Sequence, residues 1–115
     1  MVSRRIYIAG PIAGIEDGNR AAFAKRAEKL KLARFEPVNP WDIPPDHPAD
    51  VSCAGRLVDH SQTHRYGCFL REDIKVLMTC DGFTLLPGWQ DSIGASTEEH
   101  VARSMGLPLI VFDEE

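Results

Sequence analysis

The chain has 115 residues, of which 43% are hydrophobic and 26% are charged. This composition is typical of a folded globular protein, and the length is that of one domain with a single core. The net charge of −4 argues against a protein that binds nucleic-acid polymers regardless of sequence, because such binding requires a basic face. No apolar run approaches the roughly 20 residues that span a bilayer, and the first residues do not resemble a signal peptide. We therefore expect a cytoplasmic protein without membrane contact.

Strands alternate with helices along the predicted chain. Short β-branched or apolar runs predict strands, and hydrophobic residues spaced three or four positions apart predict amphipathic helices. In chain order, the predicted elements are a strand at 5–9, a helix at 19–33 with its basic residues on a solvated face, a short edge strand at 35–38, a helix at 68–79, a strand at 81–86, a helix at 94–105 and a last buried strand at 109–112. This alternation predicts an α/β fold with a small, doubly wound (flavodoxin- or Rossmann-like) parallel sheet of four to five strands and helices on both faces.

Residues 41–66 interrupt this alternation. The segment contains Pro44, Pro45, Pro48 and Gly55 among polar residues, and it is longer than an ordinary connection between elements. We interpret residues 1–115 as one domain with an irregular insertion, which could be a lid or an oligomer contact. Trp41 at its start is expected to serve packing or an interface.

No metal or cofactor is expected. Cys53, His60, His64 and Cys68 are residue types that bind zinc, but their spacing matches no standard zinc motif. The odd number of cysteines, without a Cys-x-x-Cys pair, indicates reduced thiols rather than a disulfide framework. The sequence also lacks the glycine-rich signatures of P-loop nucleotide triphosphatases and of dinucleotide enzymes.

The ligand site is expected beyond the carboxyl ends of the strands, where open parallel sheets bind their ligands. That rule selects residues 10–18 and 87–94. Ser92 and Gly94 open the helix that follows the later strand, and the unpaired N–H groups of a helix start favour an anion such as phosphate. Trp89 lies in the same predicted mouth and could stack on a base.

Glu98 is the strongest candidate for chemistry. It shares one helix face with Val101, Ala102 and Met105, so its carboxylate should point toward the packed side of the helix. A carboxylate in that position is costly unless it has a partner or a use, which favours a functional role. Glu99, beside it, is expected to behave differently.

Glu99 can pair with Arg103, four positions later, and such a pair is typical of a helix surface. Glu99 also follows Ser96 by three positions, which fits a capping box at the start of a helix. For Glu99 we therefore predict a structural role.

Asp73 also lies on an apolar stripe, together with Leu77, whereas Glu72 next to it is expected to face water. Two carboxylates would thus point inward from separate helices, and paired carboxylates are the usual means of cleaving a glycosidic bond. The structural alternative for Asp73 is a buried salt bridge to Arg71 or Arg20.

Three motifs combine these residues. They are Tyr7-Ile8-Ala9-Gly10-Pro11, Arg71-Glu72-Asp73 eight residues before Asp81, and Ser92-x-Gly94-Ala95-x-x-Glu98. With these motifs the chain resembles the nucleoside 2-deoxyribosyltransferase superfamily, which also includes 2'-deoxynucleoside 5'-monophosphate N-glycosidases. The resemblance covers nearly the whole chain apart from the insertion.

The resemblance implies that Glu98 is the nucleophile that attacks the anomeric carbon, that Tyr7 orients it, and that Asp73 is the acid near the departing base. It also implies a covalent glycosyl-enzyme and a homo-oligomer with sites near subunit contacts. Water as acceptor gives a hydrolase, and a second base gives a transferase. The substrate- or phosphate-binding residues that we expect are Gly10, Pro11, Ile12, Asn19, Arg20, Trp89, Ser92, Gly94 and Ala95.

Position 92 favours the hydrolase branch, because the transferases resemble one another in having Asp there, while the monophosphate hydrolases have Ser in contact with the 5'-phosphate. The hydrolases also carry an arginine in their first loop, which residues 10–14 lack, and Arg20 could supply that charge. We therefore expect release of free base from a (deoxy)nucleoside 5'-monophosphate. The alternatives are a deoxyribosyltransferase that exchanges bases and a catalytically silent nucleotide-binding sensor or interaction module.

Overall fold

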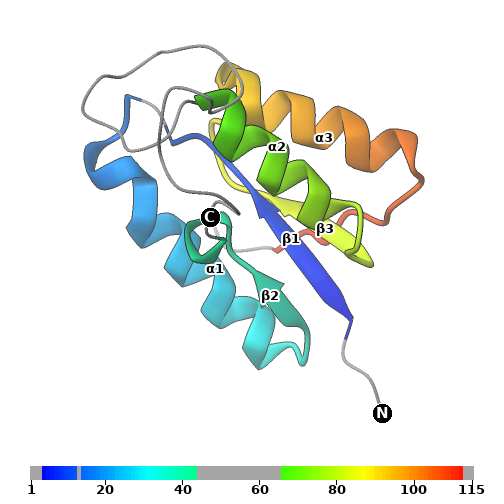
Figure 1. The fold of residues 1–115 in the computed structure, drawn as a ribbon. Coiled ribbons are helices and arrows are strands. Elements are labelled where there is room, and N and C mark those ends of the chain that lie inside the picture. Colours follow the sequence, from blue (N-terminus) through cyan, green and yellow to red (C-terminus); the bar gives the residue numbers. More distant parts are fainter. Residues whose placement is uncertain (1–3, 13, 44–65, 113–115) are drawn as a thin grey trace.

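Three parallel strands form the centre of the molecule (Figure 1). The middle strand, β1 (Arg5–Ala9), lies between β2 (Glu36–Val38) and β3 (Gly82–Leu85). In this register Tyr7 of β1 is the partner of Phe83 in β3. The central position of β1 explains why all its residues after the first are buried, as predicted. The computed structural model describes residues 4–12, 14–43 and 66–112.

The helices are α1 (Arg20–Leu32), α2 (Tyr66–Leu77) and α3 (Ile93–Ser104), with short 3-10 turns at Glu16–Asn19, Pro40–Asp42 and Trp89–Asp91. Their positions confirm the three predicted helices to within a few residues. The short edge strand and the strand before α3 are confirmed as well. Residues 44–65 of the predicted insertion lie outside the described residues, together with Cys53, His60 and His64.

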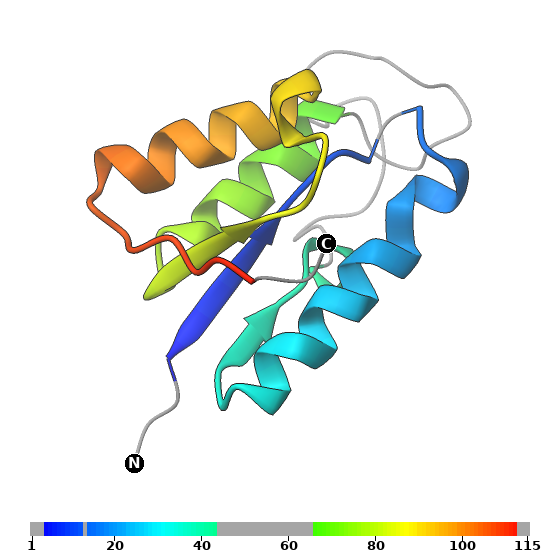
Figure 2. The same cartoon turned by 180° about the vertical axis from the view of Figure 1, so that it is seen from behind.

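Helices pack on both faces of the sheet. Successive residues of β1 point to opposite sides, so β1 contributes buried side chains to a core on each face. One core cluster, on the side of α1, contains Ile6, Ile8, Phe23, Leu30 and Leu86. The other, on the side of α2 and α3, contains Tyr7, Ala9, Val38, Leu77, Cys80, Phe83 and Ala102. Figure 2 shows α1 on one side of the strands and α2 with α3 on the other. The α/β class is therefore confirmed.

The last predicted strand is correct only in part. Leu109 forms a single parallel bridge with Phe83, and the N–H of Ile110 donates to the Phe83 carbonyl oxygen at 2.8 Å. The segment is not buried, since Leu109 is 46% and Val111 is 76% exposed. It runs along an edge of the sheet with one neighbour, so its outer side chains have no cover among the described residues. Those residues hold three strands rather than the four to five expected.

The basic side chains of α1 are not all on a solvated face as predicted. Arg26 is only 5% exposed. Its Nη1 donates to Thr84 Oγ1 at 2.6 Å and to the Leu85 carbonyl oxygen at 3.1 Å, and its guanidinium lies 5.2 Å from the centroid of the Phe112 ring. The hydrogen bonds to β3 offset part of the cost of burying this charge.

Within the described part of the chain, no helix is long and apolar enough to cross a membrane.

Candidate active site

A buried hydrogen bond joins the central strand to α3. The hydroxyl of Tyr7 donates to Glu98 Oε2 at 2.8 Å, and the two residues are 0% and 6% exposed. Tyr7 lies on the face of β1 that packs against α2 and α3. Ala102, one turn after Glu98, is fully buried in the same core and orients this side of α3 toward the sheet. The predicted inward position of Glu98 is therefore confirmed.

The predicted face of α3 is correct at Val101, which is partly buried against the core, but wrong at Met105. Met105 is 42% exposed because α3 ends at Ser104 and Met105 is the residue that caps it. The buried stripe is thus one turn shorter than the sequence suggested.

The surroundings of Glu98 disfavour its charge. Burial and, second to it, the Asp73 carboxylate raise the pKa of Glu98 to about 8, although the hydrogen bond from Tyr7 acts in the opposite direction. Burial, Glu98 and Asp73 also raise the pKa of Tyr7 well above its usual value. The Tyr7 hydroxyl consequently keeps its proton and can act as a donor throughout the pH range in which Glu98 titrates.

Asp73 lies near this pair on α2. Burial raises the pKa of Asp73 to about 7, with the Glu72 carboxylate as a second cause. The alternative of a buried salt bridge is wrong as far as the described residues go, because Arg71 is exposed and Arg20 pairs with Asp17. Among the described residues, Asp73 has no cationic partner that would offset the cost of its charge.

Asp73 and Glu98 therefore behave as a coupled pair of carboxyl groups. Since the pKa of Asp73 is about 7 and that of Glu98 about 8, the pair holds one proton between those values. A pair in this state contains one carboxylate, which can attack an electrophilic carbon, and one carboxylic acid, which can protonate a leaving group.

The turn after β1 is packed tightly against β3. A Cβ at Gly10 would lie 2.7 Å from the Cβ of Leu86, so no side chain fits there without displacement. Asn19 Nδ2 donates to the carbonyl oxygen of Pro11 at 2.9 Å, which fastens this turn to the start of α1, and Ile12 between them is partly buried. Gly10, Pro11, Ile12 and Asn19 thus lie at the carboxyl end of the sheet, as predicted.

Arg20 is held by two contacts at the same end of the sheet. Its guanidinium carbon lies 3.9 Å from the centroid of the Trp41 ring, and its Nε lies 3.6 Å from a carboxylate oxygen of Asp17. Trp41 Nε1 also donates to the Gly18 carbonyl oxygen at 3.2 Å, in a run of three left-handed residues. The predicted packing role of Trp41 is therefore confirmed, and its partner is the first loop, which the sequence did not specify.

Ser92 begins α3. Its Oγ accepts a hydrogen bond from the backbone N–H of Ala95 at 3.1 Å, so Ser92 is the N-cap. Gly94 and Ala95 are buried in the first turn. The N–H groups of a first helical turn have no partners within the helix, and the Ser92 hydroxyl retains its own proton as a donor.

The predicted capping box is wrong, because the cap lies four residues earlier than Ser96. Ser96 Oγ instead donates to the carbonyl oxygens of Trp89 at 3.2 Å and Gln90 at 3.4 Å. The predicted surface pair is confirmed: Arg103 Nε donates to Glu99 Oε2 at 2.7 Å.

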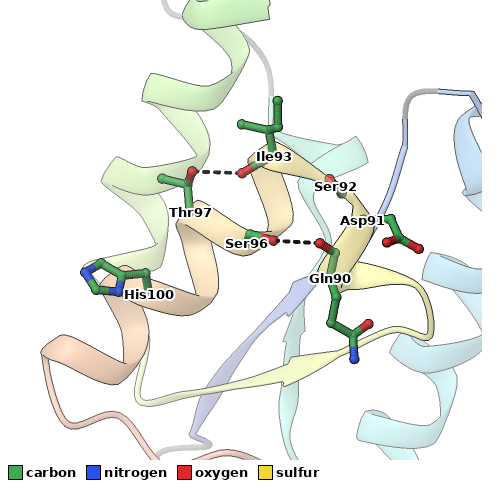
Figure 3. A pocket seen from close by; sticks show the side chains of 7 residues that line it. All are labelled: Gln90, Asp91, Ser92, Ile93, Ser96, Thr97 and His100. Atoms are coloured by element: carbon green, nitrogen blue, oxygen red, sulfur yellow. Dashed lines mark hydrogen bonds between the residues drawn. The ribbon is translucent and has the colours of Figure 1, made fainter.

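Two open depressions flank this region, and neither is lined by Glu98 or Tyr7. The first, of about 400 Å³ (Figure 3), lies on the outer side of the start of α3 and is lined by Gln90, Asp91, Ser92, Ile93, Ser96, Thr97 and His100. The second, of about 320 Å³, is lined by Arg26, Leu85, Leu86, Pro87, Gly88, Trp89, Gln90, Leu109, Ile110, Val111 and Phe112. Trp89 and Ser92 therefore line different hollows, and neither hollow is lined by Asp73 or Glu98.

A family model described as a domain of unknown function, DUF4406, matches residues 4–111. The chain belongs to this family. No curated protein matches it. The matched region of the DUF4406 domain includes Tyr7, Asp73 and Glu98, so the carboxyl pair and its hydroxyl donor lie within the family's domain. The family description names no activity.

The expected exposure of one carboxylate of this DUF4406 domain is wrong. Glu72, expected to face water, is only 8% exposed, and its Oε1 lies 3.5 Å from Lys75 Nζ. The three-residue spacing of this pair was a signal that the sequence contained. Its burial was not, because that depends on what packs against α2. Within the described residues, no group of three or more His, Cys, Asp or Glu side chains could hold a metal ion.

Proposed function

We propose that the chain cleaves the N-glycosidic bond of a (deoxy)nucleoside 5'-monophosphate through a covalent glycosyl-Glu98 intermediate and releases the free base. The observation that carries this proposal is the buried hydrogen bond from Tyr7 to Glu98, beside a second carboxyl group at Asp73. Burying carboxyl groups without cationic partners among the described residues destabilises the fold, and such groups are concentrated at functional sites. The resemblance to the deoxyribosyltransferase superfamily supports the same assignment.

In the first step, an oxygen of the Glu98 carboxylate attacks the anomeric carbon. The bond from that carbon to the base nitrogen breaks, the electron pair of the bond leaves with the base, and Asp73 gives the base a proton. Tyr7 holds Glu98 in position by its hydrogen bond. The products of this step are a glycosyl ester on Glu98 and the neutral base.

In the second step, water attacks the same carbon and transfers a proton to Asp73. The ester bond to Glu98 breaks, the carboxylate is regenerated, and the sugar 5'-phosphate is released. Because the carbon is inverted twice, the configuration of the product is that of the substrate.

The chemistry requires the shared proton on Asp73, whereas without substrate the pKa values of about 7 and about 8 favour it on Glu98. A difference of about one unit corresponds to about 1.4 kcal/mol. The hydrogen bond from Tyr7, which favours the ionised form of Glu98, already contributes to its pKa of about 8. What opposes the remaining difference is the positive charge that develops on the sugar in the transition state, because it stabilises the carboxylate.

The phosphate would lie at the start of α3 and the turn after β1. The turn after β1 adjoins the loop that leads from β3 to α3, since a Cβ at Gly88 in that loop would lie 3.5 Å from Pro11 Cγ. Ser92 offers its hydroxyl, and the first turn of α3 offers N–H groups other than that of Ala95, which bonds to Ser92, while Arg20 provides a cation at the carboxyl end of the sheet. A phosphate held there can position the sugar against Glu98.

The proposal includes the finer expectations drawn from the sequence pattern and from the resemblance. They are a doubly wound sheet with residues 109–112 as a further strand, a homo-oligomer with sites near subunit contacts, and a cytoplasmic location. No metal or cofactor takes part in the proposed reaction.

The test is chromatographic detection of free base from a panel of nucleosides and their 5'-monophosphates. We expect release from monophosphates, with a lower specificity constant for the matching nucleosides. Glu98→Gln should abolish release while keeping the fold, because the amide has the shape of the carboxylate but not its nucleophilicity. Glu99→Gln is the matched control, since Glu99 contacts Arg103 on the surface, and its activity should persist.

Methanol in the assay tests the covalent step. Capture of the intermediate by methanol should give a methyl glycoside with retained configuration. Transfer of the sugar to an added base, with a preference for nucleosides, would instead establish the transferase. Tight nucleotide binding without any release of base would establish a sensor or interaction module, and either result would overturn the hydrolase proposal.

A further inference from the structure

Trp41 follows β2 at the carboxyl end of the sheet, and the proposed mechanism does not use it. Its side chain is partly buried against the core cluster on the side of α1. Its backbone N–H donates to Asn39 Oδ1 at 3.0 Å, which fixes the short turn Pro40–Asp42. A tryptophan has few side-chain torsions, so these contacts give its ring a defined position from which it can hold a neighbour.

That neighbour is the guanidinium of Arg20, whose carbon lies 3.9 Å from the centroid of the Trp41 ring. The side chain of Arg20 is 57% exposed, and an exposed arginine without such a contact samples many rotamers. The ion pair with Asp17 does not prevent this by itself, because exposed pairs of this spacing are weak.

An ordinary pair of the same kind lies in the last turn of α1. Lys31 Nζ is 3.7 Å from a carboxylate oxygen of Glu28, three positions earlier, and both side chains are exposed. No aromatic ring among the described residues lies against Lys31. The ring contact therefore distinguishes Arg20 from an ordinary cation on the surface of this helix.

Trp41 also holds the backbone that precedes Arg20. Its Nε1 donates to the carbonyl oxygen of Gly18 at 3.2 Å, in the middle of the left-handed run Asp17, Gly18 and Asn19. Residues other than glycine adopt this conformation at an energetic cost, so such a run persists where its surroundings hold it. A Cβ at Gly18 would collide with the Trp41 ring, which shows how closely the two segments pack.

The contacts of Arg20 leave the end of its guanidinium accessible to a ligand. Nε is the atom near Asp17, and within the described ranges the two terminal nitrogens have no hydrogen-bond or ion-pair partner. Those nitrogens form the fork that binds two oxygens of a phosphate. Stacking on Trp41 uses the face of the guanidinium rather than its edge, so it is compatible with such a bond.

We propose that Trp41 is a positioning residue of the phosphate site, which orients the guanidinium of Arg20 and acts on the ligand only through it. The choice of a 5'-phosphate as ligand rests on the proposed function. The physical gain is preorganisation, because an arginine that is already ordered loses less conformational entropy when it binds an anion. Trp41 touches neither the phosphate nor the base.

A double-mutant cycle separates an action through Arg20 from an independent effect of Trp41. Trp41→Leu removes the ring and its N–H, and should weaken the binding of inorganic phosphate roughly three- to tenfold. In an Arg20→Met background the same substitution should cause no further loss, because the ring then has no cation to orient. Trp41→Phe keeps a ring face for the guanidinium, so it should bind phosphate more tightly than Trp41→Leu.

The measurement is a titration of the full chain with inorganic phosphate, followed by its backbone N–H signals in nitrogen-15 NMR. Lys31→Met is the matched control and should bind phosphate as the wild type does. Three results would each overturn the proposal. They are a wild type that binds no phosphate, an equal loss from Trp41→Leu with and without Arg20, and a Trp41→Phe variant that binds no better than Trp41→Leu.

A readout in the wild type keeps the test informative if Trp41→Leu folds poorly. The indole N–H signal of Trp41, assigned by its loss in Trp41→Phe, should shift when phosphate binds the stacked guanidinium. Arg20 is exposed, so Arg20→Met should fold, and in that variant phosphate should leave the indole signal in place. An indole signal that ignores phosphate in the wild type would contradict the proposal.

Turnover gives a separate readout. Trp41→Leu should lower the ratio of kcat/KM for a nucleotide to that for its nucleoside, chiefly through KM for the nucleotide, whereas general damage to the site would lower both values alike. If the wild type binds phosphate with the expected coupling but releases no base, the proposed reaction fails and the role of Trp41 stands. If base is released while the effects of Trp41→Leu and Arg20→Met add, the reaction stands and this role fails.

Discussion

Tyr7 and Glu98 are 91 positions apart in the sequence, and the hydroxyl of the first donates a 2.8 Å hydrogen bond to the carboxylate of the second in the protein interior. This bond lowers the pKa of Glu98, whereas burial and the Asp73 charge raise it. β1 thus supplies a hydrogen-bond donor that favours the ionised form of Glu98, whereas the other surroundings of Glu98 favour its protonated form.

Removal of that donor should slow the reaction and change its pH dependence. For Tyr7→Phe we expect kcat to fall roughly 10- to 100-fold, because a hydrogen bond to a charged group contributes about 1.5–3 kcal/mol. The upper apparent pKa of the pH profile should rise at the same time. Circular dichroism should show an unchanged fold. If neither kcat nor the alkaline limb of the pH profile changes, the hydroxyl does not act on Glu98.

Substitution of Asp73 should depend on the base that departs. Asp73→Asn cannot donate an acidic proton, so cleavage should slow most for substrates whose base is a poor leaving group. The measurement is a comparison of kcat for 5'-monophosphates whose bases differ in basicity. Equal losses for good and poor leaving groups would mean that Asp73 positions the sugar instead of protonating the base.

The two proposed roles of Ser92 can be separated, because aspartate also caps helices well. Ser92→Ala should lose about 1 kcal/mol of stability with the cap and should reduce the preference for monophosphates. Ser92→Asp should keep the cap but repel the phosphate, and so reverse the preference. The readouts are urea unfolding and the ratio of specificity constants for nucleotide and nucleoside. An undiminished preference in Ser92→Asp would remove Ser92 from the phosphate site.

The carboxyl pair, buried at Glu98 and partly buried at Asp73, should make the fold less stable as the pH rises. Folding raises the pKa of Asp73 from 3.8 to about 7 and that of Glu98 from 4.5 to about 8. Between those limits the native state binds more protons than the unfolded chain, so the contribution of these groups to stability is full below about pH 4 and is lost as the pH rises toward 8.

Glu98→Gln removes one of these titrating groups. We expect it to be more stable than the wild type by about 1–3 kcal/mol at pH 8.5 and to show a weaker pH dependence. Glu99→Gln is again the control, because the hydrogen bond from Arg103 lowers the pKa of Glu99 and keeps it ionised over this pH range, so the variant should follow the wild-type slope. Urea unfolding at pH 5.5, 7.0 and 8.5 measures this, and parallel curves for Glu98→Gln and the wild type would contradict it.

The contact between the turn after β1 and β3 should be intolerant of any side chain. Gly10→Ala would place a Cβ 2.7 Å from Leu86, and we expect a loss of about 1–3 kcal/mol of stability from this overpacking. Gly14→Asn is the control, because nothing lies within 4 Å of a Cβ there and asparagine tolerates the left-handed backbone of Gly14. Equal stability of Gly10→Ala and the wild type in thermal unfolding would refute this.

Most elements of the fold could be predicted because their patterns are local. The helical spacing in 19–33 and the apolar run in 5–9 need no knowledge of distant residues. The exposure of Leu109 and Val111 could not be predicted in this way, because an apolar run is buried only if another element covers it. The burial of Arg26 has the same explanation, since its hydrogen-bond partners lie on β3.

The candidate site was predictable to a similar degree. The inward position of Glu98 followed from its neighbours on one helix face. Its pairing with Tyr7 did not follow from spacing, and came only from the resemblance to a known family. Glu72 was assigned to the surface because a helix pattern gives the direction of a side chain but not what packs against it. The cap of α3 was misplaced because Ser92 and Ser96 both suit an N-cap, and only the position of the helix start decides between them.

The order of strands in the sheet has a consequence for how the chain folds. β1 and β2 are close in sequence, because only α1 and a short turn separate them. The other edge of β1 pairs with β3, which is far away in sequence, as the pairing of Ile6 with Gly82 shows. Pairings between segments far apart in sequence form slowly, and until they form an apolar strand edge stays open to association with other chains. During synthesis β1 is therefore unprotected on one side until β3 has emerged. Glu98 lies on the helix after β3, so a partly made or partly folded chain holds no assembled pair of carboxyl groups.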